Sequence, residues 1–362
     1  MRRIGIDARL YSQTGVGTYL RNLLFYLDKI NPQKESYYVY LQKKDASRVE
    51  FKSKNIVKRI ADQKWHSFSE QTGFLLLLLK DNLDLMHFTY FSYPILYWRK
   101  FVSTIHDTTP LLFKTGRAST KNQLIYQIKH FILKLVLSSQ VNKAKKIITP
   151  SNTVKNELIR TYGTKISKKI LPIYEGINYQ VLLTKENKSL SKKYKDFFIY
   201  VGNFYPHKNI ERLIRAFKKI RGEYKLILIG PDDYFTERIS LLIDKIKSKN
   251  RIFLIKNPSL DDLVFFYKNA LAIIHPSLSE GFGLPLVEAA YFGTPIIASN
   301  IKVFKELWKD RYLAFNPYGS LDIADKINQF IKNPTIFNYS DIIKKYSFER
   351  MTKQTLTIYN EL

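Results

Sequence analysis

The sequence predicts an α/β protein made of two doubly wound domains, each built on a parallel β-sheet. Short segments rich in β-branched and aromatic residues alternate with helical patterns along the chain, which is typical of βαβ units. The chain has 362 residues, more than one α/β core usually holds. The alternation also starts afresh near Phe197, so the strands fall into two sets.

Ten segments are expected to form strands. The first set comprises residues 4–8, 37–41, 85–87, 101–106 and 146–150, and the second comprises 198–201, 225–229, 251–254, 272–275 and 295–298. In sheets of this kind, ligands bind beyond the carboxyl ends of the strands. The loops that follow these segments are therefore the places where a functional site is expected.

The boundary between the two domains is expected near residue 172. Residues 171–196 contain a proline, a glycine and a run of Lys, Ser and Asn, a composition suited to an exposed linker. We therefore assign residues 1–172 to an N-terminal domain and residues 173–340 to a C-terminal domain. Residues 341–362 carry apolar positions at helical spacing, and we expect them to form a helix.

Composition excludes several kinds of site and leaves the partner open. The chain has no cysteine, which excludes disulfides, thiolate zinc sites, iron–sulfur clusters and cysteine nucleophiles, and which fits a reducing cytoplasm. Lysine and arginine total 59 against 31 acidic residues, a formal charge of +28. This excess favours an anionic partner such as nucleic acid, an acidic membrane surface or a phosphorylated small molecule. A solvated, lysine-rich surface explains it equally well.

No segment is expected to cross a membrane. The longest apolar run, residues 74–79, is far shorter than the roughly 20 residues that a spanning helix needs. The first ten residues lead directly into a strand pattern, without the apolar stretch of a signal peptide. Residues 124–141 form an apolar helix pattern interrupted by Lys129, His130 and Lys134. Such a helix either packs on the domain core or lies on an anionic bilayer.

The most specific segment is PSLSEGFGLPLVEAAYFGTP at residues 276–295. It follows a predicted strand and is expected to form a loop and then a short helix over 285–292. Gly281 and Gly283 flank Phe282 just before this helix, so backbone amides are free to approach an anion. The loop is therefore a candidate seat for a diphosphate.

Two carboxylates of this segment, Glu280 and Glu288, are expected to face the same strand-end region. A carboxylate accepts hydrogen bonds from two adjacent hydroxyls, the arrangement found in a ribose or a pyranose ring. The pair therefore suits a sugar nucleotide. The alternative is that Glu288 complements the helix dipole and Glu280 caps a loop, each contributing at most about 1 kcal/mol.

The segment resembles the EX7E motif of retaining GT-B glycosyltransferases of glycosyltransferase family 4, also called glycosyl transferases group 1. Five more stretches carry the resemblance, namely GIDARLYSQTGVGTYLRNLL at 5–24, STIHDTTPL at 103–111, VGNFYPHKNIERLIRAF at 201–217, ILIGPDDY at 227–234 and IKNPSLDDLVFFYKNA at 255–270. The last two look like the loops around the nucleotide base. The resemblance covers nearly the whole chain. It implies the GT-B fold, two Rossmann-like domains facing across a cleft, with the helix at 341–362 packing back on the first domain.

The resemblance also implies roles for matching residues. His106 would lie beside the donor sugar, Lys208 would bind phosphate, and Glu280 would bind the sugar hydroxyls, which makes these three the candidate catalytic residues. Glu288 would bind the ribose. Further donor-binding candidates are Gly15, Gly17, Asn203, His207, Gly230, Pro231, Asn257, Gly281, Phe282, Gly283 and Leu284.

Three of these positions depart from the family pattern. Many relatives have a basic residue in place of Asn203, commonly an arginine in place of His207, and a glycine in place of Asn257. The first departure bears on how fully the site neutralises the leaving diphosphate.

The implied reaction displaces a nucleoside diphosphate from the anomeric carbon, and its main demand is to stabilise negative charge on the leaving group. Helix amides and Lys208 could meet this demand. The sequence contains no D-x-D triplet, so we expect a metal-independent enzyme. The family implies retention, and no residue suggests itself as a covalent nucleophile, so a same-face displacement is the working hypothesis. Glu280, Glu288, Lys208 and His106 are expected to converge on one interdomain pocket.

The resemblance favours transfer of a hexose, with mannose from GDP-mannose preferred, to a glycan or lipid-linked acceptor in cell-surface polysaccharide assembly. No cofactor beyond the nucleotide sugar is expected, and the location is cytoplasmic, with peripheral attachment to the inner face of the membrane left open. A sugar-nucleotide epimerase or a glycan phosphorylase is an alternative on the same fold. The charge also permits a non-enzymatic nucleic-acid or anionic-surface binding protein, but no recognisable nucleic-acid module is present.

Overall fold

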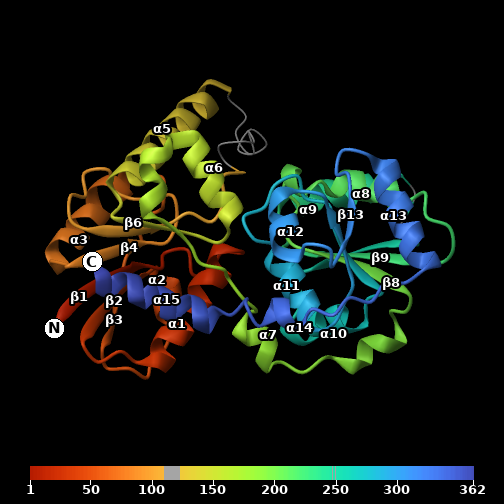
Figure 1. Cartoon of the computed structure of the whole chain (residues 1–362), viewed down its shortest axis with the longest axis horizontal. Coiled ribbons are helices and arrows are strands. Elements are labelled where there is room, and N and C mark those ends of the chain that lie inside the picture. Colours follow the sequence, from red (N-terminus) through yellow and green to blue (C-terminus); the bar gives the residue numbers. More distant parts are fainter. Residues whose placement is uncertain (110–122, 247, 249) are drawn as a thin grey trace. The chain divides into compact units, whose positions relative to one another are not determined.

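The computed structural model describes residues 1–109, 123–246, 248 and 250–362, which form two compact units (Figure 1). Unit 1 comprises residues 1–175 and 347–362, and unit 2 comprises residues 176–346. Each unit contains one parallel sheet with helices on both faces. The predicted class, two doubly wound α/β domains, is therefore confirmed. Residues 110 and 111, which end the stretch at 103–111, lie outside the described residues.

The sheet of unit 1 has the strand order β3-β2-β1-β4-β5-β6-β7. Its strands are β1 (Arg2–Asp7), β2 (Glu35–Leu41), β3 (Ile56–Ile60), β4 (Leu85–Phe88), β5 (Phe101–Thr104), β6 (Lys146–Thr149) and β7 (Ile170–Pro172). The strand order reverses between β1 and β4. Strands β2 and β3 continue the sheet on the β1 side, and β5, β6 and β7 continue it on the β4 side. This reversal is the point where open α/β sheets place their ligands.

Helices cover both faces of this sheet. They are α1 (Val16–Ile30), α2 (Lys43–Ala46), α3 (Leu75–Asp81), α5 (Gln123–Lys143), α6 (Asn152–Tyr162) and α15 (Phe348–Glu361), with a π-helical turn η1 (Glu70–Phe74) and a 3₁₀ turn η3 (Thr164–Lys169). Side chains of α3, α5 and α6 share one core cluster, while α1 and α15 pack together on the other face. The last helix of the chain thus belongs to the first sheet.

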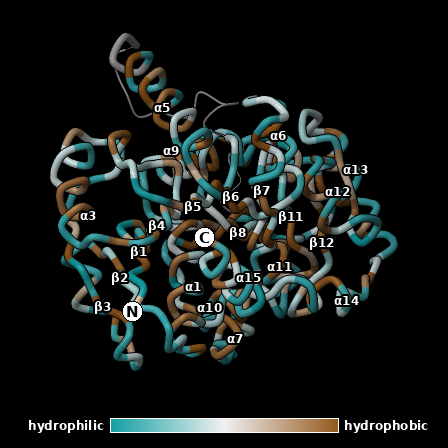
Figure 2. The backbone as a smooth tube through the Cα atoms, turned by 60° about the vertical axis from the view of Figure 1, so that its left-hand side comes forward, coloured by the Kyte–Doolittle hydropathy of each residue, from teal (hydrophilic) through white to brown (hydrophobic). Residues whose placement is uncertain are grey.

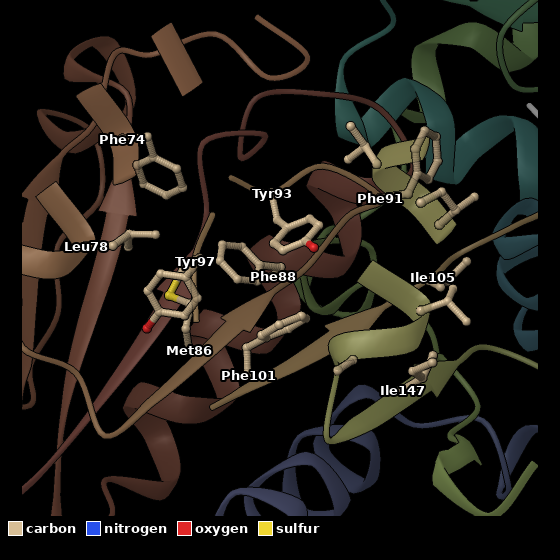
Figure 3. Close-up of a cluster of buried hydrophobic side chains, with 14 of the residues drawn as sticks. Phe74, Leu78, Met86, Phe88, Phe91, Tyr93, Tyr97, Phe101, Ile105 and Ile147 are labelled. Atoms are coloured by element: carbon tan, nitrogen blue, oxygen red, sulfur yellow. The ribbon is translucent and has the colours of Figure 1, made fainter. Parts of the chain in front are cut away.

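Aromatic side chains dominate the core under α3 and α5 (Figure 3). Phe88 at the end of β4 meets Phe101 of β5 edge to face, with ring centroids 5.3 Å apart, and Tyr93 and Tyr97 close the cluster from the loop between these strands. All four residues of β4 are buried, as expected for a central parallel strand covered on both faces.

The sheet of unit 2 has the strand order β10-β9-β8-β11-β12-β13. Its strands are β8 (Phe197–Val201), β9 (Lys225–Gly230), β10 (Ile252–Lys256), β11 (Ala272–His275), β12 (Ile296–Ser299) and β13 (Leu313–Phe315). The helices are α7 (Tyr179–Leu183), α8 (Ile210–Phe217), α9 (Tyr234–Lys245), α10 (Leu260–Asn269), α11 (Leu284–Tyr291), α12 (Lys302–Trp308), α13 (Ser320–Lys332) and α14 (Ser340–Ile343), with 3₁₀ turns η4 (Lys188–Lys192) and η5 (Pro206–Lys208). The order reverses between β8 and β11.

All ten predicted strands are present, with ends that differ from the prediction by at most two residues. Three strands were not predicted, namely β3, β7 and β13. Each of them lies at the edge of its sheet, and β7 and β13 have only three residues. Short edge strands bury little apolar surface, so their sequences lack a clear pattern.

Two expectations about connecting segments were wrong. Residues 171–196 are not an exposed linker, because they include the end of β7, the helix α7 and the turn η4, and they bury Val181 and Tyr194. Residues 341–362 are not one helix. The helix breaks at 344–347, where Ser347 caps α15 by accepting a hydrogen bond from the backbone NH of Arg350.

Among the described residues, no helix combines the length and apolarity required to span a membrane.

Candidate functional site at the strand ends

The loop after β11 holds the most specific sequence segment of the chain. Strand β11 ends at His275, and α11 begins at Leu284 with Pro285 in its first turn, one residue earlier than expected. Gly283 has a φ of 94°, and an added Cβ would lie 2.9 Å from Phe304. Both facts require glycine at this turn. Any other residue at position 283 would strain the backbone or collide with Phe304, so the turn into α11 depends on this glycine.

Glu280 lies at the centre of a hydrogen-bond cluster in this loop. Its Oε1 accepts from Lys208 Nζ at 2.6 Å and from Ser277 Oγ at 2.7 Å. His275 Nε2 lies 2.9 Å from the same oxygen. Lys208 comes from the loop after β8, so the cluster joins the two strands between which the strand order reverses. The structure thus brings together two of the predicted catalytic residues.

The Glu280 side chain is only 10% exposed, and its carboxylate is ionised. Burial by itself would raise the pKa of the Glu280 carboxyl, but Lys208 and His275 outweigh burial and hold that pKa well below its usual range. The negative charge is therefore paired, as a buried charge must be. An ionised carboxylate at this position is a strong acceptor for hydroxyl groups.

The loop that carries Lys208 is fixed to the loop after β11. Asn209 has a φ of 63° and donates through Nδ2 to the carbonyls of Pro276, at 3.0 Å, and Pro317, at 2.7 Å. The backbone NH of Leu278 donates to the carbonyl of His207 at 2.8 Å. These bonds set the position of Lys208 relative to Glu280.

Glu288 lies on α11 and is buried in a different environment. Its Oε2 accepts a hydrogen bond from the hydroxyl of Tyr267 on α10 at 2.7 Å. Burial, reinforced by the charge of Glu288, raises the pKa of Tyr267 well above its usual value, so the hydroxyl keeps its proton and remains a donor. Glu288 thus accepts a hydrogen bond from a neutral hydroxyl, and Glu280 accepts one from a cation.

The loops after β8, β9 and β10 form a second group of predicted donor-binding residues. Gly230 ends β9, and an added Cβ there would lie 2.5 Å from the carbonyl oxygen of Gly202. Its own carbonyl accepts from the backbone NH of Asn257 at 2.9 Å. Pro231 follows Gly230, and the NH of Asp232 donates to Asn257 Oδ1 at 3.2 Å. The structure therefore brings Gly230, Pro231 and Asn257 together.

Four other candidates of unit 2 lie in different surroundings. The ring of Phe282 is buried against Tyr346, with centroids 5.3 Å apart, so this side chain belongs to the core. Asn203 Oδ1 is buried, and within the described part of the chain it has no hydrogen-bond partner. Burial, with a smaller effect of Lys208, lowers the pKa of His207 to about 4. Gly281 lies in the buried loop beside Phe282.

His106 lies in unit 1, two residues after β5. Its Nε2 is 2.9 Å from the carbonyl oxygen of Thr89, and because a carbonyl can only accept, Nε2 carries a proton. Its Nδ1 lies 3.1 Å from Glu175 Oε1, and the Tyr19 ring meets the imidazole edge on at 4.7 Å. Both ring nitrogens of His106 therefore already have protein partners.

The glycine loop of unit 1 lies at the start of α1. Gly15, with a φ of 56°, is the residue before α1, and an added Cβ at Gly17 would lie 2.7 Å from the carbonyl oxygen of Tyr11. Tyr19 in the next turn connects this helix to His106. These residues gather near the reversal point of the first sheet. That they share one pocket with Glu280, Glu288 and Lys208 stays a prediction.

Sequence reasoning did not single out several side chains that build these clusters. His275 and Ser277 flank the start of the quoted segment, and their proximity to Glu280 in sequence was an available signal. Tyr267 looks like a core aromatic of a helix, and Glu175 lies at the border of the segment taken for a linker. Asn209 gave no signal in the sequence, and it shares its positive φ with Asn31, Asn82 and Asn257.

Comparison with known families agrees with this arrangement. The family model described as Glycosyltransferase Family 4 matches residues 14–181, and the one described as Glycosyl transferases group 1 matches residues 183–350. The two matches correspond to the sheets of units 1 and 2 almost in full.

Individual relatives are similar over most of the chain. The O-antigen chain mannosyltransferase RfbU of Salmonella typhimurium is 28% identical over 289 residues, which cover 79% of this chain and 76% of that protein. The O-antigen chain mannosyltransferase B of Escherichia coli is 26% identical over 275 residues, with 72% and 70% covered.

Solved structures show the fold. Sucrose-phosphate synthase from Thermosynechococcus elongatus superimposes with a TM-score of 0.78 at 17% identity, covering 100% of this chain and 99% of that chain. HepE of Anabaena, in complex with UDP and glucose, gives 0.75 at 16% identity with both chains covered completely. The expected GT-B fold of two Rossmann-like domains is confirmed.

Proposed function

The chain belongs to the glycosyl transferases group 1 of glycosyltransferase family 4, and from this premise we propose that it transfers mannose from GDP-mannose to a glycan or lipid-linked acceptor. The enzyme is a glycosyltransferase, and the choice of mannose is supported by the two O-antigen chain mannosyltransferases that it resembles. The observation that carries the proposal is the Lys208–Glu280 pair at the reversal point of the second sheet.

In this proposal Glu280 and Lys208 contact different parts of the donor. The Glu280 carboxylate accepts hydrogen bonds from hydroxyls of the donor sugar, and Lys208 contributes positive charge beside the leaving diphosphate. Backbone amides at the start of α11, opened by Gly281 and Gly283, add to that stabilisation. The sequence has no D-x-D triplet to hold a divalent cation, and the proposed reaction needs none.

The transfer itself is a same-face displacement. The bond between the anomeric carbon and the diphosphate oxygen breaks, and the electron pair leaves with the nucleoside diphosphate. The acceptor hydroxyl forms the new bond on the same face, and its proton passes to the departing phosphate oxygen. His106 would make a polar contact near the reacting carbon, and Glu288 would bind the ribose.

We also propose a location for this activity at the inner face of the cell membrane, with a lipid-linked glycan as acceptor. The excess of 59 basic over 31 acidic residues supports an anionic surface as partner.

The donor is tested with a panel of GDP-, UDP- and ADP-hexoses, by measuring nucleoside diphosphate release and product formation with a glycan acceptor. We expect the fastest transfer with GDP-mannose. Faster transfer from a UDP- or ADP-sugar overturns the donor assignment. Donor isomerised without acceptor indicates an epimerase, and phosphate-dependent glycan cleavage indicates a phosphorylase.

The site is tested in the same assay with Glu280→Gln and Lys208→Ala. Loss of an interaction that stabilises the transition state should lower kcat by about 10²- to 10³-fold in each variant. Glu211→Gln, an exposed carboxylate on α8, is the matched control. Circular dichroism confirms that the variants fold. Wild-type turnover in either site variant would remove that residue from the mechanism.

A further inference from the structure

A stripe of large apolar side chains lies exposed along α5. Ile128, Phe131, Ile132 and Leu135 are 52%, 62%, 51% and 51% exposed, respectively. Their positions follow the spacing i, i+3, i+4, i+7, which places them on one face of the helix. We call these four residues the apolar stripe. Contiguous exposed apolar surface of this kind is uncommon on soluble proteins and marks an interaction site.

The apolar stripe is separate from the face that holds α5 on the domain. Val136, Leu137 and Val141 belong to the core cluster of unit 1, so the carboxyl-terminal half of the helix is anchored. The amino-terminal half projects beyond the neighbouring elements of unit 1 (Figures 1 and 2). Burial in the core therefore does not explain why the stripe is apolar.

The charges of α5 indicate what covers the stripe. Residues 123–143 contain lysines at 129, 134 and 143 and no acidic residue. At about 100° per residue, Lys129 and Lys134 lie on opposite flanks of the stripe. Both are exposed. An apolar centre flanked by lysines is the pattern of a helix that lies in the surface of an anionic bilayer, with the lysine stems reaching up to the headgroups.

We propose that unit 1 docks on an anionic lipid bilayer through α5. The apolar stripe enters the boundary between headgroups and acyl chains, and Lys129 and Lys134 pair with lipid phosphates. The inference rests on the proposed function, because it identifies the part of the protein that would contact the membrane where the transfer is proposed to occur. It commits to a bilayer rather than a protein partner, because lysines on both flanks complement a continuous anionic plane.

The test is sedimentation of the full chain with phosphatidylcholine vesicles, with and without phosphatidylglycerol. We expect binding to the anionic vesicles that weakens with added salt. The double variant Phe131→Ser/Ile132→Ser should lower this binding by about tenfold or more, because two side chains no longer insert. The matched control is Phe68→Ser/Leu76→Ser, which removes two apolar side chains of unit 1 that are 83% and 66% exposed.

Three results would overturn the proposal. They are absence of wild-type binding to anionic vesicles, equal binding by the stripe variant, and a wild-type dimer that the stripe variant abolishes on a sizing column. The last result would show a second copy of the chain on the stripe. Transfer to a water-soluble acceptor, measured on the same variants, should stay at the wild-type rate. If the wild type itself showed no transfer, the proposed function would be contradicted instead.

A second inference comes from the surroundings of His275. The residue is 1% exposed, and its ring lies between Tyr200, stacked at 5.5 Å, and Phe304, edge on at 5.6 Å. Its Nδ1 is buried, and none of the described residues hydrogen-bonds to it. Because Nε2 faces the Glu280 carboxylate, the proton of the neutral ring belongs on Nε2.

We infer that His275 is a positioning residue that aims Glu280 at the donor sugar. His275, Ser277 and Lys208 all bond to Oε1, and no donor among the described residues bonds to Oε2. Oε2 is therefore the oxygen left to accept from a sugar hydroxyl. This inference also rests on the proposed function, because it assumes that Glu280 contacts the sugar.

The test compares two affinities, one for the sugar nucleotide that reacts fastest in the donor panel and one for its nucleoside diphosphate. His275→Phe should weaken sugar-nucleotide binding by about tenfold and leave nucleoside diphosphate binding unchanged, since only the sugar contact depends on Glu280. His275→Gln, whose amide can still donate to Glu280, should restore most of the loss. Equal weakening of both ligands would show a merely structural role and overturn the inference.

A spectroscopic measurement on the wild type keeps the inference testable if His275→Phe does not fold. The ¹⁵N shifts of the His275 ring should show a protonated Nε2 and an unprotonated Nδ1. The opposite tautomer would overturn the inference, whatever the donor proves to be.

Discussion

At the scale of single residues, Glu280 and Glu288 show how one segment gives two carboxylates different properties. Glu280 pairs with the Lys208 cation, whereas Glu288 accepts a hydrogen bond from the neutral Tyr267. The pairing with Lys208 concerns residues 72 positions apart. It was expected from the family resemblance, which implies that both residues bind the donor. The contact with Tyr267 was not, because an aromatic residue in an apolar helix gives no sign that its hydroxyl bonds to the site.

The ribose role of Glu288 leads to a prediction at this scale. Glu288→Gln keeps an oxygen for Tyr267 but removes the charge, so affinity for free nucleoside diphosphate should fall by about tenfold or more. Isothermal titration calorimetry measures this affinity, with Glu211→Gln as the exposed control. Unchanged affinity in Glu288→Gln would exclude a contact between this carboxylate and the ribose.

At the scale of elements, the central strands were predictable, whereas only β10 of the four edge strands was predicted. Residues of β4, β8 and β11 are buried on both faces, and their nearly continuous apolar runs give a clear pattern. The edge strand β13 has three residues, too few for a period to show. The segment at 171–196 was misjudged because its polar residues conceal buried contacts made by Val181 and Tyr194.

The close approach of β9 to the loop after β8 gives a prediction for an element. In Gly230→Ala the new Cβ would lie 2.5 Å from the Gly202 carbonyl oxygen and 2.6 Å from the Phe204 ring, so the loop must shift. The free energy of unfolding of unit 2 should fall by about 1–3 kcal/mol, as in other overpacked sites. Urea unfolding followed by circular dichroism measures it.

The control for this variant is Gly319→Ala, where the nearest atoms to an added Cβ lie at an ordinary 3.7 Å. Because Gly319 is also the N-cap of α13, where alanine is less favourable than glycine, the variant's free energy of unfolding should fall, but by less than in Gly230→Ala. Equal stability of the two variants would show that the strand end tolerates a side chain.

At the scale of the whole molecule, the alternation of strands and helices was sufficient to predict two doubly wound domains. This alternation does not show which helix packs on which sheet. Residues 341–362 were expected to form one helix, but the chain leaves unit 2 after α14 and returns to unit 1 as α15. Local periodicity cannot show such a break, because the apolar positions continue through it.

Stability of the molecule should depend on pH through His87. Burial, with a smaller effect of His106, lowers the pKa of His87 to about 3. The unfolded chain therefore binds a proton near the usual histidine pKa of about 6.5 that the folded chain does not bind. Below that pH the free energy of unfolding should fall by about 1.4 kcal/mol per pH unit from this residue, until the folded pKa is reached.

Urea unfolding at several pH values between 6 and 4 measures this dependence. His87→Gln cannot take up the proton, so its unfolding free energy should fall less steeply on acidification than that of the wild type. Parallel slopes for the two proteins would contradict the assignment.

Helix α15 has a consequence for the synthesis of the protein. Tyr359 of this helix bonds to His87 in β4 with a separation of 2.5 Å, so unit 1 is closed by residues that the ribosome adds only after all of unit 2. Domains usually fold in the order in which they emerge. Unit 2 can therefore fold first in the nascent chain, while the apolar side of α1 stays uncovered until α15 has been synthesised.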